Sequence, residues 1–378
     1  MRTRFILLLF SFISFGVCLV AGCQNKQAKP LPVIRVGHAP HDHHSSLYIA
    51  ASNPEYFQQN GGIHLKEVLP KKEYTLIANN KPVARVLIDS STGGNELIRK
   101  LAEDQFDMAF GGVPAMIEFI DNGSCLKIAA PIMTEGSGLV LSNKIPAANW
   151  SEFVDYASKQ KNQIRIGYKI DVSVQNLIFE YALREVGLSY SNKLDDTKAQ
   201  ILLVNLHGAK NLIPALKNKI IDGFVINQPF AALAEHQGVG KTIASLSTLP
   251  PKGKWEGNPC CALAVCSKFA AAAPDITEKF ITLMLRANHF IIKNPEKSAN
   301  QIAQWLGIPQ EVEQKSIPTI KFSTSFDQKW DQGINFWIEN MIRDGKLKGP
   351  VKEAYEKGDI KSTIYTLGLY QRVQKEIK

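Results

Sequence analysis

Short apolar segments alternate with amphipathic segments along most of this chain, and this rhythm limits the possible folds more than any other feature. The segment "VIRVGH" at 33–38 is typical of a buried strand, and "SSLYIAAS" at 45–52 has helical spacing with serine at its start. Six further strand-like segments follow, namely "VARVLIDS", "FDMAFGG", "CLKIAAPIM", "QIRIGYKI", "QILLVNL" and "IDGFVIN". Most are separated by helical segments of about ten residues, which indicates a parallel or mixed sheet covered on both faces. The sequence therefore predicts an α/β fold.

One unit of this pattern occurs twice. The segments "LIRKLAEDQFDMAFGGVPA" and "LIPALKNKIIDGFVINQPFA" align without a gap on Leu-Ile, Leu, Asp and Pro, so Asp107 corresponds to Asp222 and Pro114 to Pro229. Any helix–turn–strand–helix unit tends toward such a pattern, so common ancestry stays open. A chain of 378 residues is also longer than one typical domain. We expect two lobes of similar design, with lobe I at 33–140, lobe II at 141–265, and 266–378 returning to lobe I with C-terminal helices.

The N-terminus is typical of an exported protein. "MRTR" is a basic start, "FILLLFSFISFGVCLV" is an apolar stretch too short to span a bilayer comfortably, and "VAGC" follows it. That ending is similar to a bacterial lipobox. We therefore expect residues 1–22 to be a lipoprotein signal peptide, Cys23 to be lipidated, and residues 23–32 to be a polar tether. The alternative is an ordinary secretory signal cut near Ala21.

Charge and cysteine content narrow the partners. The formal net charge is +9, but the Lys and Arg residues are scattered and form no basic run, so nucleic acid is not an expected partner. Four cysteines remain beyond the lipobox: Cys125, Cys260, Cys261 and Cys266. They allow three full disulfide pairings, and the sequence does not choose among them.

The loops after the predicted strands are rich in polar residues and glycine. In an open α/β sheet, ligands bind beyond the carboxyl ends of the strands, and a loop leading into a helix offers free N–H groups to an oxyanion. Each serine could equally be a helix cap. The residues that we predict to contact a ligand are His38, His41, His44, Ser45, Ser91, Thr92, Gly93, Gly112, Ser173, Gln175 and Gln228.

The segment "GHAPHDHHSS" holds half of the eight histidines of the chain. It joins the first strand to the first helix, so contact with a ligand by His41 and His44, with Ser45 as cap or donor, is the leading interpretation. A solvated loop without function and a Zn²⁺ site are the alternatives. Against a metal, neighbouring rings in a turn are expected to point apart, and His64, His207, His236 and His289 are isolated. We predict no metal and no cofactor.

The segments "RVGHAP", "STGGNELIRKLAEDQFDMAFGGVPA", "VSVQNLIFEYALREVGL" and "ALKNKIIDGFVINQP" resemble the nitrate/sulfonate/taurine group of solute-binding proteins of ABC transporters. That group includes thiamine-pyrimidine precursor binders and the related pyrimidine synthases. The resemblance covers residues 33 to 310 and implies a type II periplasmic-binding-protein-like fold, with two lobes joined by crossovers that we place near "GLVLSN" and "ALAVCS".

The resemblance implies a monomeric, lipid-anchored binding component that hands a small solute to a membrane permease, outside the cytoplasm and without catalysis. The alternatives are a pyrimidine-synthase-like enzyme, because "HDHHSS" and "NPCCALAVC" superficially match its histidine and cysteine-rich segment, and a metal receptor. The loop motifs contain no Arg, although Lys169 and Lys210 lie beside two of them. A small oxyanion, a sulfonate or a neutral heterocycle is therefore favoured over a phosphate or dicarboxylate that needs a bidentate clamp.

Overall fold

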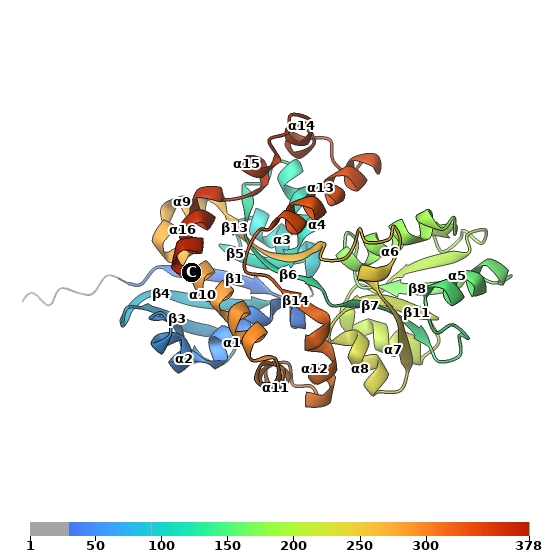
Figure 1. Cartoon of the computed structure of the whole chain (residues 1–378), viewed down its shortest axis with the longest axis horizontal. Coiled ribbons are helices and arrows are strands. Elements are labelled where there is room, and N and C mark those ends of the chain that lie inside the picture. The colour runs from blue at the N-terminus through green and yellow to red at the C-terminus, as the bar shows by residue number, and fades with distance from the viewer. Residues whose placement is uncertain (1–29, 92, 378) are drawn as a thin grey trace, which may run out of the picture. The chain divides into compact units, whose positions relative to one another are not determined.

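The computed structural model describes residues 30–91 and 93–377, and these residues form two mixed sheets flanked by helices (Figure 1). The predicted α/β architecture is confirmed. The large sheet has the strand order β14-β6-β13-β5-β1-β4-β3-β2, and the small sheet has the order β12-β7-β11-β8-β10-β9. The strands of the large sheet are β1 (Val33–His38), β2 (Ile63–Leu69), β3 (Glu73–Ala78), β4 (Lys81–Ser90), β5 (Met108–Gly112), β6 (Leu126–Glu135), β13 (Pro259–Cys266) and β14 (Ile320–Phe322). Those of the small sheet are β7 (Ser137–Ser142), β8 (Ile164–Tyr168), β9 (Tyr190–Ser191), β10 (Ile201–Asn205), β11 (Gly223–Asn227) and β12 (Gly240–Ser245).

The helices cover both sheets and continue beyond the last strand. Those of the first 300 residues are α1 (Ser45–Ser52), α2 (Pro54–Gln59), α3 (Gly94–Ala102), α4 (Val113–Asp121), α5 (Trp150–Lys159), α6 (Val174–Glu185), α7 (Leu212–Lys217), α8 (Phe230–His236), α9 (Ser267–Ala272) and α10 (Pro274–Lys293). The rest are α11 (Pro295–Leu306), α12 (Gln310–Ser316), α13 (Gln328–Arg343), α14 (Pro350–Glu356), α15 (Ile360–Ile364) and α16 (Leu367–Ile377). The long helix α10 packs against α1 and α16, which returns the C-terminal region to the large sheet.

The hairpin β2–β3 at the edge of the large sheet was not predicted from the sequence. Burial alternates residue by residue along β3, as expected for a strand with one covered face. Asn79 and Asn80 connect β3 to β4 and both have positive φ, 49° and 61°. A two-residue turn with positive φ at both positions is the type I′ geometry that suits tight hairpins, and asparagine tolerates it. The Asn-Asn pair was therefore the signal for this hairpin.

The chain passes between the sheets twice. The first passage is the single residue Gly136, between β6 and β7, and the second is the segment 246–258 between β12 and β13. The strand "CCALAVC" is therefore part of the large sheet along its full length. The second crossover was predicted near "ALAVCS", and the structure has it earlier in the chain, before β13 begins. The division into lobes at 140/141 and 265/266 stays a proposal.

The repeated aspartates of the sequence have the same role in both sheets. Asp107, just before β5, accepts hydrogen bonds from the backbone N–H of Arg35 at 2.7 Å and from its guanidinium at 2.6 and 3.0 Å. Asp222, just before β11, does the same with Arg165, at 2.9 Å from the backbone N–H and at 2.8 and 3.0 Å from the guanidinium. Each carboxylate fixes the start of one strand against its parallel neighbour, β1 or β8. The repeated Asp therefore has a structural cause.

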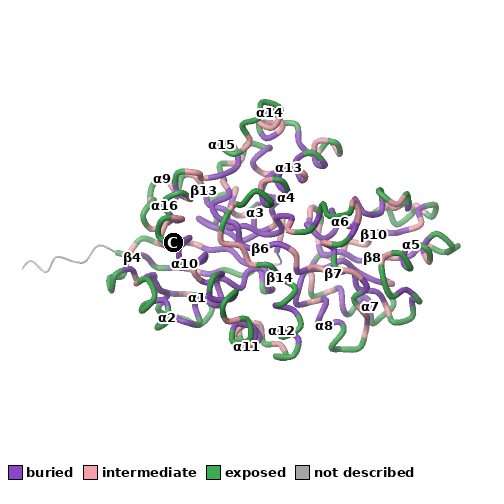
Figure 2. The backbone as a smooth tube through the Cα atoms, viewed as in Figure 1, coloured by how far each residue is buried: buried purple, intermediate pink, exposed green. Residues whose placement is uncertain are grey.

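The core lies between the sheets and their helices, where the central strands are buried and the outer faces of the helices are exposed (Figure 2). Trp330 and Trp337 of α13 are part of this core, and both are buried. The described cysteines Cys125, Cys260, Cys261 and Cys266 are all free, so none of the three pairings is formed.

The two Arg–Asp pairs differ in burial, so we expect them to contribute differently to the free energy of unfolding. The Asp107 side chain is 9% exposed and that of Asp222 is 32% exposed. We expect Asp107→Asn to lower the free energy of unfolding by about 2 kcal/mol, because it weakens buried bonds to a charged group. Asp222→Asn should cost about 1 kcal/mol because water screens that pair. Urea unfolding measures both, with the exposed Asp195→Asn as the control; equal losses in both variants would contradict this assignment.

Candidate functional site

The histidine-rich loop is buried rather than solvated. It runs from the end of β1 through a 3₁₀ turn (Asp42–His44) into α1. His38, His41, His43 and His44 are 4%, 5%, 1% and 1% exposed, so the interpretation as a solvated loop is wrong. The reason is that the apolar helix α1 packs against α10 and α11 and holds the loop inside the fold.

The imidazole rings also converge, contrary to the expectation that they point apart. The ring centres of His41 and His44 are 4.2 Å apart, and those of His41 and His43 are 5.5 Å apart. His41 is extended, with φ −159° and ψ 166°, and the 3₁₀ turn starts directly after it. This change of backbone direction turns three rings toward one region. Sequence spacing did not predict it, because the expectation assumed a single turn conformation.

Hydrogen-bond partners decide which nitrogen of each ring carries the proton. Nδ1 of His44 accepts from the backbone N–H of Ala39 at 2.9 Å, so Nε2–H is its donor, and that atom has no partner among the described residues. Nε2 of His43 lies 2.8 Å from the carbonyl oxygen of Gly136. A carbonyl only accepts, so His43 donates through Nε2–H and keeps the lone pair on Nδ1.

Gly136 makes this approach of His43 possible. Its φ is 63°, in the left-handed region that favours glycine. A Cβ at this position would lie 3.0 Å from Nε2 of His43 and 2.5 Å from Cγ1 of Ile320. The passage between the sheets therefore contacts the histidine loop through a residue that cannot carry a side chain without displacing its neighbours.

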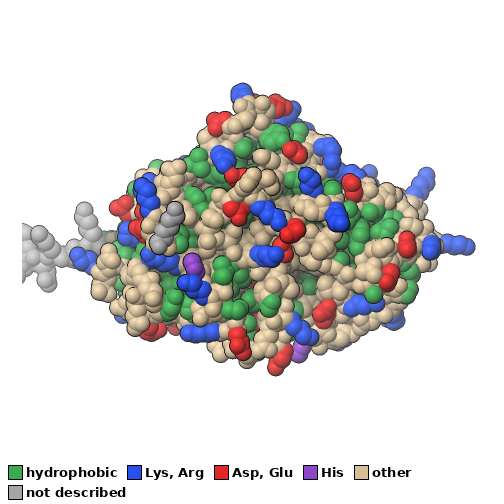
Figure 3. All heavy atoms as spheres, viewed as in Figure 1, with side chains coloured by type: hydrophobic (Ala, Val, Ile, Leu, Met, Phe, Trp, Pro, Cys, Tyr) green, Lys and Arg blue, Asp and Glu red, His purple; other side chains and the backbone are tan. Residues whose placement is uncertain are grey.

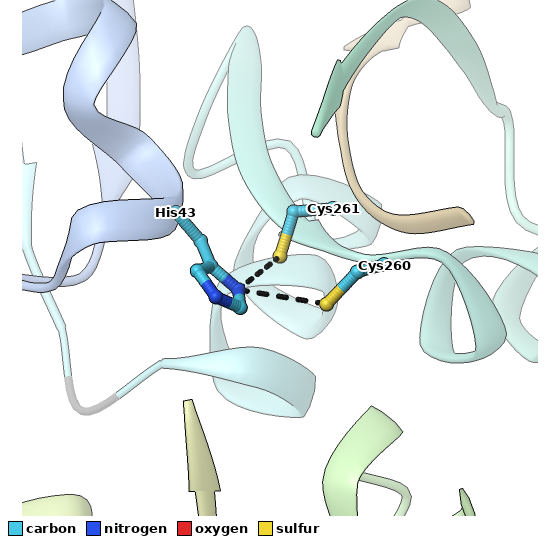
Figure 4. A group of neighbouring side chains, drawn as sticks. All are labelled: His43, Cys260 and Cys261. Carbon is cyan, nitrogen blue, oxygen red and sulfur yellow. Dashed lines mark hydrogen bonds between the residues drawn. The ribbon is translucent and has the colours of Figure 1, made fainter. Parts of the chain in front are cut away.

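Two cysteines face His43 from the adjacent strand β13. Sγ of Cys260 and Sγ of Cys261 lie 3.5 and 3.7 Å from Nδ1 of His43 (Figure 4). The contact between the thiols, together with His43 and His44, holds the pKa of Cys261 well below its usual range, and the same contact raises the pKa of Cys260. The cysteine pair was visible in the sequence, but its proximity to His43 was not.

A buried lysine completes the polar interior. Lys169 follows β8, is 6% exposed, and donates from Nζ to Oδ1 of Asn227 at 2.7 Å. Burial lowers its pKa, and the nearby thiols of Cys261 and Cys260 act in the opposite direction. Within the described part of the chain no carboxylate forms an ion pair with it. The side chain that accepts a hydrogen bond from this ammonium is a neutral amide, so the ammonium is a candidate site for an anion.

Two cavities meet at His41. The outer cavity has a volume of about 340 Å³, and the inner chamber has about 20 Å³, enough for about one water molecule. The outer cavity is lined by Ala39, Pro40, His41, Ser90, Ser91, Glu96, Lys100, Gly208, Ala209, Lys210 and Phe230. The inner chamber is lined by His41, His44, Gly94, Gly111, Gly112, Lys169, Val172, Ser173, Val174, Gln175 and Cys261. Both sets combine loops of the large sheet with loops of the small sheet.

Most of the predicted contact residues lie at these cavities. Those that line them are His41, His44, Ser91, Gly112, Ser173 and Gln175. The Ser173 hydroxyl also caps α6 by accepting from the N–H of Asn176, as the alternative for serines anticipated. Ser45 is buried, makes no capping bond and has no partner for its hydroxyl among the described residues. That these residues bind a solute stays a prediction.

Besides Ser45, three predicted residues among those described line neither cavity. Nδ1 of His38 lies 3.2 Å from the Tyr48 hydroxyl, and Oε1 of Gln228 accepts from the N–H of Ala232. Gly93 precedes the helix that brings Gly94 to the inner chamber. Thr92 lies outside the described residues. Lys169 and Cys261 are two polar residues of the inner chamber that were not among the predicted contact residues.

Two buried carboxyl groups lie side by side, one in the histidine-rich loop and the other in α12. Asp42 accepts a hydrogen bond from the Ser316 hydroxyl, and Glu313 of α12 lies beside it. Burial raises the pKa of Asp42 to about 6. Burial and the neighbouring Asp42 raise the pKa of Glu313 well above its usual range. The pair therefore keeps at least one proton at neutral pH.

Residues 27–307 match the model of the NMT1-like family. The chain belongs to this family. Over 137 residues, this NMT1-like protein is 35% identical to an uncharacterized protein of Methanocaldococcus jannaschii, a region that covers 36% of this chain and 94% of the relative.

Solved structures with the same fold include several ligand-binding proteins. The periplasmic nitrate-binding protein NrtA from Synechocystis has a TM-score of 0.69 at 13% identity, over 92% of this chain and 89% of that one. The ligand-binding component of an ABC-type import system from Staphylococcus aureus, with zinc bound, has a TM-score of 0.68 at 15% identity, over 90% of this chain and 99% of that one. The alkanesulfonate-binding protein SsuA from Xanthomonas axonopodis, bound to MOPS, has a TM-score of 0.62 at 14% identity, over 85% of this chain and 96% of that one. The predicted resemblance and fold class are confirmed.

The buried carboxyl pair predicts a dependence of stability on pH. The folded pKa of both acids is raised, so the folded NMT1-like protein binds more protons than the unfolded chain, and stability is lost as pH rises from about 4 through 6 and beyond. Glu313→Gln should remove part of this loss and raise the free energy of unfolding at pH 8 by about 1–3 kcal/mol, with little change at pH 4. The exposed Glu311→Gln on the same helix is the control. Chemical denaturation at both pH values tests this, and a variant less stable than wild type at pH 8 would refute it.

Proposed function

We propose that this protein is the extracytoplasmic, lipid-anchored solute-binding component of an ABC importer, and that its solute is a small oxyanion or sulfonate. The proposal is supported by the roles of proteins with the same fold, which include a nitrate-binding and an alkanesulfonate-binding protein. In this proposal the loops of the two sheets enclose the solute, and the protein passes it to a membrane permease.

Lys169 is the observation that carries the choice of an anion. It is a buried ammonium at the inner chamber, and within the described residues its nitrogen donates a hydrogen bond to the neutral amide of Asn227. Nε2–H of His44 and the hydroxyl of Ser91 are further buried polar groups without partners in the described part of the chain. A buried donor without a partner costs free energy, and an oxyanion would satisfy several of these groups together.

The face of the protein seen in Figure 3 shows no concentration of positive charge that would attract an anion. Figure 3 shows Lys and Arg side chains mixed with Asp and Glu over the visible face. Charges of opposite sign at short separations largely cancel beyond a screening length of about 8–10 Å. Selection of an anion would therefore depend on the buried ammonium and its neighbouring donors.

The two passages between the sheets support closure around a solute. One is a single glycine and the other is the segment 246–258, and a hinge of a few residues is the usual means of domain closure around ligands. In this proposal the outer cavity of about 340 Å³ is the entrance and narrows as the loops approach the bound solute.

The proposal includes the absence of catalysis. The alternative is an enzyme similar to the pyrimidine synthases, which would use the histidine loop together with Cys260 and Cys261. The two classes differ in one measurement. A binding protein releases its solute unchanged after prolonged incubation, and mass spectrometry of the recovered compound detects any conversion.

Substitution of Lys169 tests the anion. Lys169→Met should keep the fold, because it replaces a buried charge with an apolar chain of similar length, and should weaken anion binding about 10- to 100-fold. The measurement is calorimetric titration with nitrate, sulfate, an alkanesulfonate and, as a neutral arm, a pyrimidine. The exposed Lys193→Met is the control. Unchanged anion affinity in Lys169→Met, or binding of the pyrimidine alone, would overturn this choice of solute.

The lipid anchor has its own test. Cys23 lies outside the described residues, and no helix within them is both long and apolar enough to cross a bilayer. We expect the wild-type protein to fractionate with membranes in a bacterial host and Cys23→Ala to lose the lipid and most of the membrane-bound fraction. Cys125→Ala is the matched control. Equal distributions of wild type and Cys23→Ala would show that the protein is not lipid-anchored through this residue.

A further inference from the structure

We infer that His43, Cys260 and Cys261 bind one thiophilic divalent cation of the Zn²⁺ class beside the first passage between the sheets. The three ligand atoms lie within 4.8 Å of one another, and all three residues are buried. This set differs from the histidine run considered from the sequence, because it takes one imidazole from the loop and two sulfurs from β13. The inference does not depend on the identity of the solute.

The distances match those of a coordinated ion. In a tetrahedral site with Zn–N of about 2.0–2.1 Å and Zn–S of about 2.3 Å, a nitrogen and a sulfur ligand lie about 3.5 Å apart. Nδ1 of His43 lies 3.5 Å from Sγ of Cys260 and 3.7 Å from Sγ of Cys261. Both sulfurs point toward this one nitrogen (Figure 4). Small movements of the side chains would therefore complete the coordination.

The orientation of His43 is the one that metal-binding histidines need. A ligating imidazole commonly donates its second N–H to a carbonyl or carboxylate, which fixes the ring and leaves the other nitrogen for the metal. In this protein the Gly136 carbonyl is that acceptor, at 2.8 Å from Nε2. The lone pair of Nδ1 faces the two sulfurs as a consequence.

Hydrogen bonding alone explains the position of two sulfurs beside Nδ1 of His43 less completely than a bound cation does. The single lone pair of Nδ1 can accept one S–H well, while two sulfurs lie at similar distances from it. The sulfur of Cys260 also lies 3.8 Å from the amide of Gln175, and Cys261 also interacts with His44. A cation would satisfy all three ligand atoms together.

Charge and access agree with a divalent ion. Two thiolates and a neutral imidazole balance a charge of +2, so the ion would leave the ammonium of Lys169 available to an anion. Cys261 also lines the inner chamber, whose volume of about 20 Å³ leaves space for a water molecule as fourth ligand and for entry of the ion.

The experiment uses the full reduced chain, with Cys18 and Cys23 replaced by serine in every sample so that only the four described thiols report. Zn²⁺ is titrated in competition with a chromogenic chelator, and Co²⁺ is added separately because thiolate coordination gives intense charge-transfer absorption. We expect one ion per chain, and an affinity loss of at least about 100-fold in Cys260→Ser and in Cys261→Ser, since each removes a direct ligand. Zn²⁺ should also protect two thiols from alkylation.

Matched controls separate the site from other cysteines and histidines. Cys266 lies on β13 with the two cysteine ligands, and His64 is a buried histidine elsewhere in the fold. The variants Cys266→Ser and His64→Gln should therefore bind Zn²⁺ as tightly as the parent protein. Circular dichroism verifies that each variant is folded. His43→Gln should lose Zn²⁺ affinity while retaining the two reactive thiols. Binding that is unaffected by the cysteine substitutions, a stoichiometry below one, or the absence of charge-transfer absorption with Co²⁺ would each overturn the site. Loss of anion binding in Lys169→Met with Zn²⁺ binding intact would leave this inference standing.

Discussion

The hydrogen bond from Nε2–H of His43 to the carbonyl of Gly136 connects the parts of this protein on which its site depends. It joins the loop after β1 to the residue where the chain leaves the large sheet. Because both groups are buried, water cannot replace the bond, and an unpaired carbonyl or imidazole there would cost free energy. The same bond sets the proton of His43 on Nε2 and directs Nδ1 to Cys260 and Cys261. One contact thus fixes the loop, the protonation state and the environment of the two thiols.

The interior that surrounds this bond concentrates groups that ordinarily prefer water. Burial holds the pKa of His41 well below its usual range, with the neighbouring His44 and Lys169 acting in the same direction, so its ring is neutral. Lys169 and the Cys261 thiol are the groups whose charges attract each other there. Polar groups are kept in such a place at a cost in stability, and functional sites are where such costs are commonly found. The rest of the fold compensates, through a core that spans both sheets and the helices from α10 onward.

The proposed anion site and the proposed cation site lie next to each other in the same buried region. An anion would contact the ammonium of Lys169 and the donors at the inner chamber, whereas a thiophilic cation would lie between His43 and the cysteines of β13. Cys261 belongs to both regions, since its sulfur lies 3.7 Å from His43 and its residue lines the chamber. Binding at one site can therefore influence the other through electrostatics, without a change in the fold.

The sequence by itself determined the α/β class, the repeated unit and much of the site. Alternating apolar and amphipathic segments predict strands and helices because burial follows the period of each element. Parallel strands place the loops after their carboxyl ends at one edge, so His41, His44, Gly112, Ser173 and Gln175 could be selected before any coordinates. The tertiary structure decided the rest. The burial of the histidine loop depends on α10 and α11, more than 200 residues away in the chain. The meeting of His43 with Cys260 and Cys261 depends on β13 returning between β5 and β6, and no local pattern encodes which strand becomes a neighbour after so long a connection.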